Sequence, residues 1–230
     1  MGRLIGTSPF FKPGPPAQVG HGSESVTAFL LEQAEGTVLD LGGGRGAYAY
    51  ELMKRGADVT VGEIDPVCLQ AAAEAGMKTL DLTRTEWSAL KDGFDTVAMF
   101  DVLEHIPDYE AFLGHALACA RKKIVLTVPC NDDFEELFRV NLTYNHIAVS
   151  DHINQFTSGD MRALLERTGL EFEIRKGDFL LRSSIVPLVY GKLRRNPIGF
   201  FLAVPLKLLC VLGWVPDRFP SRLFVMIKKQ

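Results

Sequence analysis

Four glycines fall within five residues of the sequence, directly after a short apolar run that contains one acid. The acid is Asp40, and the glycines are Gly42, Gly43, Gly44 and Gly46. Glycine permits sharp backbone turns and lets a bound molecule lie against the main chain. A helix that begins right after such a loop points free N–H groups and the positive end of its dipole toward an anion. This stretch therefore predicts a loop that holds a cofactor.

Three further acids stand at the ends of apolar runs later in the chain. They are Glu63, Asp81 and Asp101. A carboxylate accepts hydrogen bonds from hydroxyl, amide and ammonium groups. If the runs are parallel strands of one sheet, these acids lie at the edge where ligands of such sheets bind, beyond the carboxyl ends of the strands.

The apolar runs and the segments between them alternate as strands and helices. A first helix, capped by Ser23 or Ser25 and stopped at Gly36, precedes the first strand. Strands are expected at 38–41, 57–62, 77–80, 95–100 and 123–129, and helices at 47–54, at 67–75 and from about 109 to 117. This alternation predicts a parallel sheet with helices on both faces, joined by right-handed crossovers.

Composition limits the remaining possibilities. The 230 residues are 47% hydrophobic and carry a net charge of -3, so the chain can form one substantial core and has no charge bias toward nucleic acid. Four scattered cysteines without a CxxC pair favour a reducing compartment and argue against structural zinc, and no metal site is expected. Residues 1–22 have four prolines and no apolar signal-peptide core, which predicts a flexible lead-in to a cytoplasmic protein.

The combination of motifs resembles the class I S-adenosylmethionine-dependent methyltransferases, particularly their small bacterial branch. The residues that carry the resemblance lie at 39–46, at 63–66 and at 94–107. The last of these stretches finishes with Asp-Val-Leu-Glu-His-Ile-Pro. The resemblance covers roughly residues 23–182 and a last strand. The combination is more specific than any single motif.

The resemblance implies S-adenosylmethionine as the cofactor and assigns a role to each acid. Glu63 is expected to accept both ribose hydroxyls, and Asp81 to accept from the adenine amino group. Asp40 and the backbone near Phe100 and Asp101 are expected to bind the methionine ammonium. The full expected cofactor-binding set is Asp40, Gly42, Gly44, Gly46, Glu63, Ile64, Asp81, Leu82, Phe100 and Asp101.

Other interpretations of the same residues stay open. The spacing Gly42-x-Gly44-x-x-Ala47, with Glu63 about twenty residues later, also satisfies the dinucleotide fingerprint of nicotinamide enzymes. Asp81 is equally well explained as a helix cap, and Asp65 as a cap before a proline at the first helical position. Asp101 and Glu104 would also favour the start of the turn that follows them.

Methyl transfer is an in-line displacement at the sulfonium methyl, so the enzyme mainly has to align the acceptor. A hydroxyl acceptor also has to lose its proton. His105 and His152 are the candidate bases, because histidine titrates near neutral pH. Tyr144 and His146 are weaker candidates for the acceptor pocket. An amine or carbon acceptor needs no base.

The end of the sequence predicts a closing hairpin. A helix is expected at 160–168 behind a Thr157 or Ser158 cap, then an alternating strand at 170–175 and a terminal strand at 222–227. In the family these two strands form an antiparallel hairpin at the sheet edge. The expected fold is therefore a Rossmann-like, doubly wound α/β sheet of seven strands, with strands 6 and 7 as the edge hairpin.

Between the two last strands lies an apolar segment, 183–220, with basic residues before a nearly continuous apolar stretch. It predicts a helical insert that packs on the core, on a second subunit in a homodimer, or in the surface of a membrane. A true span is disfavoured by Pro205 and Lys207.

These patterns predict a lead-in at 1–22, a methyltransferase core at 23–182, the insert at 183–220 and a last core strand at 221–230. The expected activity is methylation, most simply on oxygen, of a small-molecule, glycan or lipid-linked acceptor. The enzyme is expected in the cytoplasm, either free or in peripheral contact with the inner face of the membrane. The competing hypotheses are a non-catalytic S-adenosylmethionine-binding scaffold and a nicotinamide-dependent oxidoreductase.

Overall fold

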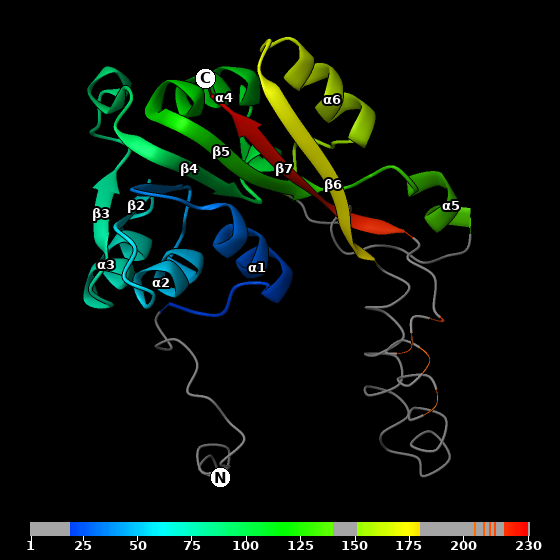
Figure 1. Cartoon of the computed structure of the whole chain (residues 1–230), viewed down its shortest axis with the longest axis horizontal. Coiled ribbons are helices and arrows are strands. Elements are labelled where there is room, and N and C mark those ends of the chain that lie inside the picture. Colours follow the sequence, from blue (N-terminus) through cyan, green and yellow to red (C-terminus); the bar gives the residue numbers. More distant parts are fainter. Residues whose placement is uncertain are drawn as a thin grey trace.

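A computed structural model describes residues 19–139, 151–179 and 219–229, together with positions 205, 209, 212 and 214. Within these residues, seven strands form one sheet in the order β3-β2-β1-β4-β5-β7-β6 (Figure 1). The first five strands are parallel, and β7 pairs antiparallel with both β5 and β6. The sheet has the seven-stranded, doubly wound arrangement that the sequence predicted.

The elements alternate along the chain. The strands are β1 (Val38–Leu41), β2 (Val59–Glu63), β3 (Lys78–Asp81), β4 (Phe94–Phe100), β5 (Ala120–Pro129), β6 (Glu171–Phe179) and β7 (Pro220–Lys228). The α-helices are α1 (Glu24–Gln33), α2 (Ala47–Met53), α3 (Pro66–Glu74), α4 (Tyr109–Cys119), α5 (Phe134–Arg139) and α6 (Ser158–Glu166). Two short 3-10 turns, η1 (Trp87–Leu90) and η2 (Leu103–His105), complete the described elements.

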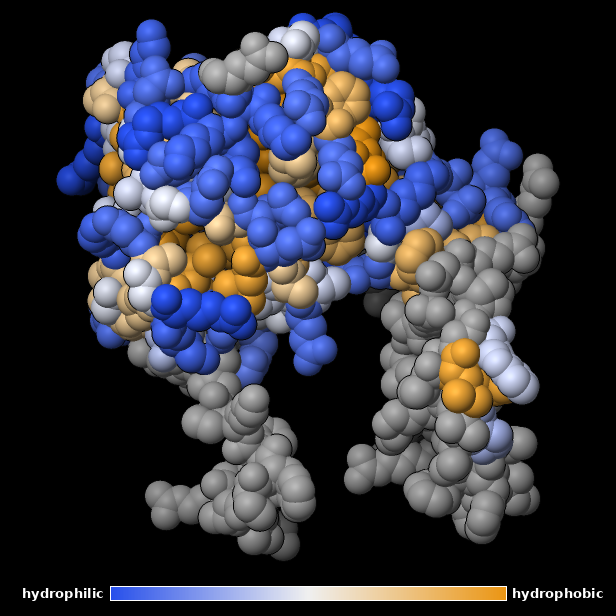
Figure 2. Space-filling model, viewed as in Figure 1, coloured by the Kyte–Doolittle hydropathy of each residue, from blue (hydrophilic) through white to orange (hydrophobic). Residues whose placement is uncertain are grey.

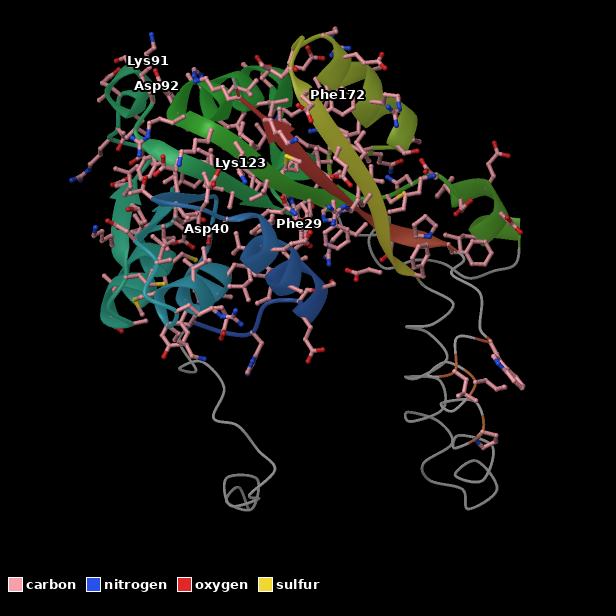
Figure 3. All side chains as sticks on the ribbon, in the orientation of Figure 1. Phe29, Asp40, Lys91, Asp92, Lys123 and Phe172 are labelled. Carbon is pink, nitrogen blue, oxygen red and sulfur yellow. The ribbon has the colours of Figure 1, made fainter. Side chains whose placement is uncertain are left out.

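Helices cover both faces of the sheet. Figure 1 shows α1, α2 and α3 on one side of the strands and α4 and α6 on the other. On β1, Leu39 and Leu41 join the core beneath α4 and α6, whereas Val38 joins the core beneath α1 and α2. This division follows from the alternation of side chains along a strand, and it turns Asp40 toward the α2 side. In Figure 3, Phe29 on α1 and Phe172 on β6 mark the two sides.

Several boundaries differ from the sequence-based expectation. The strand predicted at 123–129 begins three residues earlier, at Ala120, and the terminal strand begins at Pro220. The predicted cap at Asp65 is confirmed, since its side chain accepts from the Val67 N–H at 2.8 Å. The cap of α6 is Thr157, which forms a capping box with Asp160.

Hydrophilic residues cover most of the described surface in the view of Figure 2. No helix among the described residues is long and apolar enough to cross a bilayer. The insert predicted at 183–220 lies almost wholly outside the described residues, as do Tyr144 and His146. Of its few described positions, Leu212 and Trp214 are exposed.

Candidate active site

The glycine loop joins β1 to α2 and has the left-handed backbone that glycine favours. Gly42, Gly44 and Gly46 have φ values of 74°, 54° and 82°. A Cβ at Gly42 would lie 2.8 Å from the Val102 side chain, and one at Gly46 would lie 2.5 Å from Met77. The loop therefore packs closely against neighbouring side chains, and its shape requires glycine, which has no side chain, at these positions. At Gly44, a Cβ would meet nothing within 4 Å, so this residue borders open space.

Asp40 lies beneath this loop and is 1% exposed (Figure 3). Its Oδ2 has no hydrogen-bond partner within the described part of the chain. Burial raises the pKa of Asp40 to about 7, although a hydrogen bond from the Ala49 backbone N–H in the first turn of α2 acts in the opposite direction. The chain thus keeps an unsatisfied carboxylate oxygen next to the glycine loop.

Glu63 ends β2 and reaches across to the same loop. Its carboxylate accepts the backbone N–H of Gly44 at 2.9 Å, of Ile64 at 2.7 Å and of Asp65 at 3.2 Å. The side chain of Ile64 beside it is 64% exposed and offers apolar surface at the strand end. The structure therefore brings Glu63 and the glycine loop together, as the sequence predicted.

Asp81 ends β3, the neighbour of β2. One carboxylate oxygen accepts from the Thr83 backbone N–H at 2.9 Å and from the Thr83 hydroxyl at 2.6 Å. The hydroxyl bond is the main reason that the pKa of Asp81 is lowered. The carboxylate thus forms a turn rather than a helix cap. The N–H of Leu82 donates to the Glu63 carbonyl at 3.0 Å and fixes the two strand ends to each other.

Asp101 follows Phe100 at the end of β4 with a left-handed φ of 54°. Its two carboxylate oxygens accept from Arg222 of β7, at 2.8 Å and 3.3 Å, and one also accepts from the Thr127 hydroxyl at 2.9 Å. Phe100 is buried, and its ring packs edge-to-face with that of Tyr48 on α2, with the ring centroids 5.0 Å apart. A side chain from the far end of the sequence therefore holds Asp101.

Arg222 also joins a wider polar network that sequence reasoning missed. Its guanidinium donates to Asp178 of β6 at 2.6 Å, and Asp178 accepts from the Ser25 hydroxyl at 2.9 Å. Ser23 lies 2.8 Å from Ser25, and its N–H donates to the Tyr48 hydroxyl at 3.2 Å. The one available signal was a lone arginine at the start of an otherwise apolar terminal strand.

The two predicted bases, His105 and His152, meet at the same edge of the sheet. Their rings lie 4.7 Å apart in an edge-to-face arrangement. His105 Nδ1 lies 3.0 Å from the Asp151 carbonyl oxygen and 3.6 Å from the Asp151 carboxylate. Since a carbonyl only accepts, Nδ1 carries the proton, and Nε2 of a neutral ring has a free lone pair.

Glu104 lies beneath this histidine pair and is 0% exposed. Neither carboxylate oxygen has a hydrogen-bond partner among the described residues, and burial raises the pKa of Glu104 to about 8. The sequence-based interpretation gave Glu104 only a part in the following turn. Its neighbours in the sequence, a histidine and a proline-terminated turn, did not indicate how deeply it would be buried.

Backbone hydrogen bonds fasten the two histidine loops to each other. The Glu104 carbonyl accepts the N–H groups of Ile153 and Asn154, at 2.9 Å and 3.0 Å. The Asn154 side chain donates to the carbonyls of Leu103 and Ile106, at 3.0 Å and 2.7 Å. The loop after β4 and the loop before α6 therefore act as one support for both histidines.

Comparison with known proteins identifies the family to which this site belongs. Residues 21–173, about two thirds of the chain, match the model of a methyltransferase domain family. The chain is a class I S-adenosylmethionine-dependent methyltransferase. Its cofactor is S-adenosylmethionine. The resemblance found in the sequence is confirmed, and neither the scaffold hypothesis nor the nicotinamide hypothesis is retained.

Solved structures with the same fold are distant in sequence from this methyltransferase. A magnesium protoporphyrin IX methyltransferase from Synechocystis, with S-adenosylhomocysteine bound, is 18% identical with a TM-score of 0.54, over 90% of this chain and 81% of that one. An S-adenosylmethionine-dependent methyltransferase from Archaeoglobus fulgidus is 15% identical with a TM-score of 0.58, over 90% and 94%.

One curated relative is closer in sequence over a short stretch. The ubiquinone biosynthesis O-methyltransferase of Paramagnetospirillum magneticum is 35% identical over 95 residues, which is 39% of this chain and 38% of the relative. The methyltransferase thus matches less than half of that relative's length.

Proposed function

We propose that this methyltransferase transfers its methyl group to a hydroxyl oxygen of a small-molecule, glycan or lipid-linked acceptor. The observation that carries the proposal is the His105–His152 pair, with ring centroids 4.7 Å apart at the carboxyl end of β4. A hydroxyl acceptor needs a base, whereas a neutral amine does not. The short stretch shared with a curated O-methyltransferase supports the same acceptor atom.

Two features of the chain suit the cofactor. The unpartnered Oδ2 of Asp40 beside the glycine loop would accept from a cationic ammonium group. The Glu63 carboxylate, with exposed Ile64 next to it, would accept the ribose hydroxyls while Ile64 contacts the adenine ring. Since three backbone N–H groups already donate to Glu63, the ribose would share or replace some of these bonds.

The remaining predicted cofactor residues have narrower roles in this proposal. Asp81 is held in a turn by Thr83, and its other oxygen, 3.5 Å from Nε of the exposed Arg84, would accept from the adenine amino group. Asp101 is bound by Arg222, so the backbone at Phe100 and Asp101, rather than the Asp101 carboxylate, would receive the methionine end. Leu82 would lie against the adenine from the β3 side.

The transfer conserves atoms and charge. When bound, S-adenosylmethionine would supply a methyl group attached to a positively charged sulfonium, and the sulfur would become a neutral thioether after the transfer. A histidine of the pair takes the hydroxyl proton, and the oxygen lone pair forms the new O–CH₃ bond as the S–CH₃ bond breaks. His105 is suited to this task because the Asp151 carbonyl holds its proton on Nδ1 and leaves Nε2 to accept.

The test is transfer of a deuterated methyl group from labelled cofactor to a panel of phenols, sugars, carboxylic acids and amines, read by mass spectrometry. The proposal expects labelled ethers from hydroxyl acceptors and a loss of rate of at least about 100-fold in His105→Asn or His152→Asn. Label found on amines alone, or full activity in both variants, would contradict it.

A further inference from the structure

We propose that Glu104, His105 and His152 form a binding site for a divalent transition-metal cation. Each side chain offers one ligand atom, and these atoms all lie within 4.8 Å of one another. Ligands of a four-coordinate ion at about 2.1 Å lie roughly 3.4 Å apart. Small side-chain rotations would therefore bring the three atoms into coordination. The sequence alone predicted no metal site.

The burial of Glu104 is the second, independent observation. The side chain is 0% exposed, and neither carboxylate oxygen accepts a hydrogen bond from any described residue. A buried carboxylate without a partner is unfavourable, and such groups are normally protonated, paired or bound to a metal ion. A cation between Glu104 and the two histidines would supply the missing partner.

The surroundings of His105 match those of a metal ligand. A histidine that binds a metal through one nitrogen usually donates its other N–H to a carbonyl or carboxylate, which fixes the ring and its tautomer. His105 Nδ1 has both kinds of acceptor in Asp151, the carbonyl at 3.0 Å and the carboxylate at 3.6 Å. Nε2 is then the nitrogen that would bind the ion.

The backbone holds the three ligands at fixed positions. Glu104 and His105 belong to η2, and His152 lies in the loop whose N–H groups at Ile153 and Asn154 donate to the Glu104 carbonyl. Both loops are therefore fixed to each other next to the ligand atoms. A site of this kind needs little reorganisation to receive an ion.

The donor set indicates the class of ion. Two imidazoles and one carboxylate suit Zn²⁺, Fe²⁺, Co²⁺ or Mn²⁺, and three protein ligands leave coordination positions open. If the proposed O-methylation is correct, the acceptor oxygen would bind at an open position. In the metal-bound enzyme, the cation would lower the pKa of the acceptor hydroxyl, whose proton would pass to water, and the two histidines would act as ligands. They would act as bases only in the metal-free enzyme.

The binding test uses the full chain, stripped of metal with a chelator and then dialysed. Calorimetric titration with Zn²⁺ and Mn²⁺ should give one site per chain, and Co²⁺ should produce the visible absorption of a histidine-bound ion. Glu104→Gln and His152→Asn should each weaken binding at least about tenfold, because the loss of a hydrogen-bond partner of a ligand alone costs roughly that much. His115→Asn is the matched control, since His115 is exposed and stacks on Trp87, and it should bind as the wild type does.

The result separates this site from the proposed activity. A circular dichroism spectrum equal to that of the wild type would establish that a variant has folded. If Glu104→Gln or His152→Asn does not fold, His105→Asn is used in its place. Absence of a one-to-one site in the wild type, or equal affinity in His152→Asn and His115→Asn, would overturn the metal site. Ether formation by the stripped enzyme at the full rate would leave O-methylation in place and refute only the cation's part in it.

Discussion

At the scale of single residues, two buried carboxylates of the site, Asp40 and Glu104, have oxygens without a hydrogen-bond partner among the described residues. Asp40 is almost fully buried beside the glycine loop, and burial raises its pKa to about 7. Such a group reduces stability unless a cation compensates it. The ammonium group of the cofactor is a compensating cation in the proposed geometry. In this proposal, the buried Asp40 lowers the stability of the free protein, and its charge is compensated when the cofactor binds.

The proposed role of Asp40 predicts that cofactor binding depends on pH. Since only the ionised carboxylate attracts the ammonium, affinity should increase as the pH rises through about 7, and binding should release a proton. S-adenosylhomocysteine should bind about tenfold more tightly at pH 8 than at pH 6, as measured by calorimetry. Asp40→Asn should bind weakly at both pH values, and an unchanged pH dependence in that variant would refute the role of Asp40.

At the scale of elements, the site depends on the strand order. Parallel β1, β2, β3 and β4 bring their carboxyl ends to one edge, whereas antiparallel β7 brings its beginning to the same edge. That reversal is why Arg222, so late in the sequence, reaches Asp101 on β4 and Asp178 on β6. The edge hairpin therefore supports the end of β4 as well as closing the sheet.

Removing Arg222 should destabilise this support. The Arg222 side chain is 11% exposed, so Arg222→Met would leave Asp101 and Asp178 as uncompensated, half-buried charges. The free energy of unfolding in urea should fall by about 3 kcal/mol. Arg175→Met is the matched control, because Arg175 is 45% exposed in its pairs with Glu173 and Glu32 and should cost less than about 1 kcal/mol. Equal losses would refute the distinction.

The glycine loop gives a second test at this scale. Gly46→Ala places a side chain at a φ of 82° and against Met77, so it should cost about 1 kcal/mol and weaken S-adenosylhomocysteine binding. Gly76→Ala has nearly the same φ, 86°, with nothing within 4 Å of the added Cβ. The control should lose only the part of the stability that comes from backbone strain and should keep its affinity. Weaker binding in Gly76→Ala would show that the effect is not local to the loop.

At the scale of the whole molecule, the sequence predicts the sheet better than it predicts the site. Apolar runs and glycines indicate where strands and loops lie, because burial and backbone sterics act locally along the chain. Contacts between distant segments leave no local pattern. Arg222 reaching Asp101, and His152 reaching Glu104 across the two loops, follow only from the packed fold. The insert expected at 183–220, which the sequence predicts to pack on the core, on a second subunit or in a membrane surface, stays a prediction.

The most direct test of this account is calorimetric binding of S-adenosylhomocysteine to Glu63→Gln. Loss of charge-assisted hydrogen bonds to the ribose should weaken affinity about 10- to 100-fold. Glu74→Gln, at the exposed last position of α3, is the control and should bind as the wild type does. Equal affinity of Glu63→Gln and Glu74→Gln would contradict the claim that acids at the strand ends hold the cofactor.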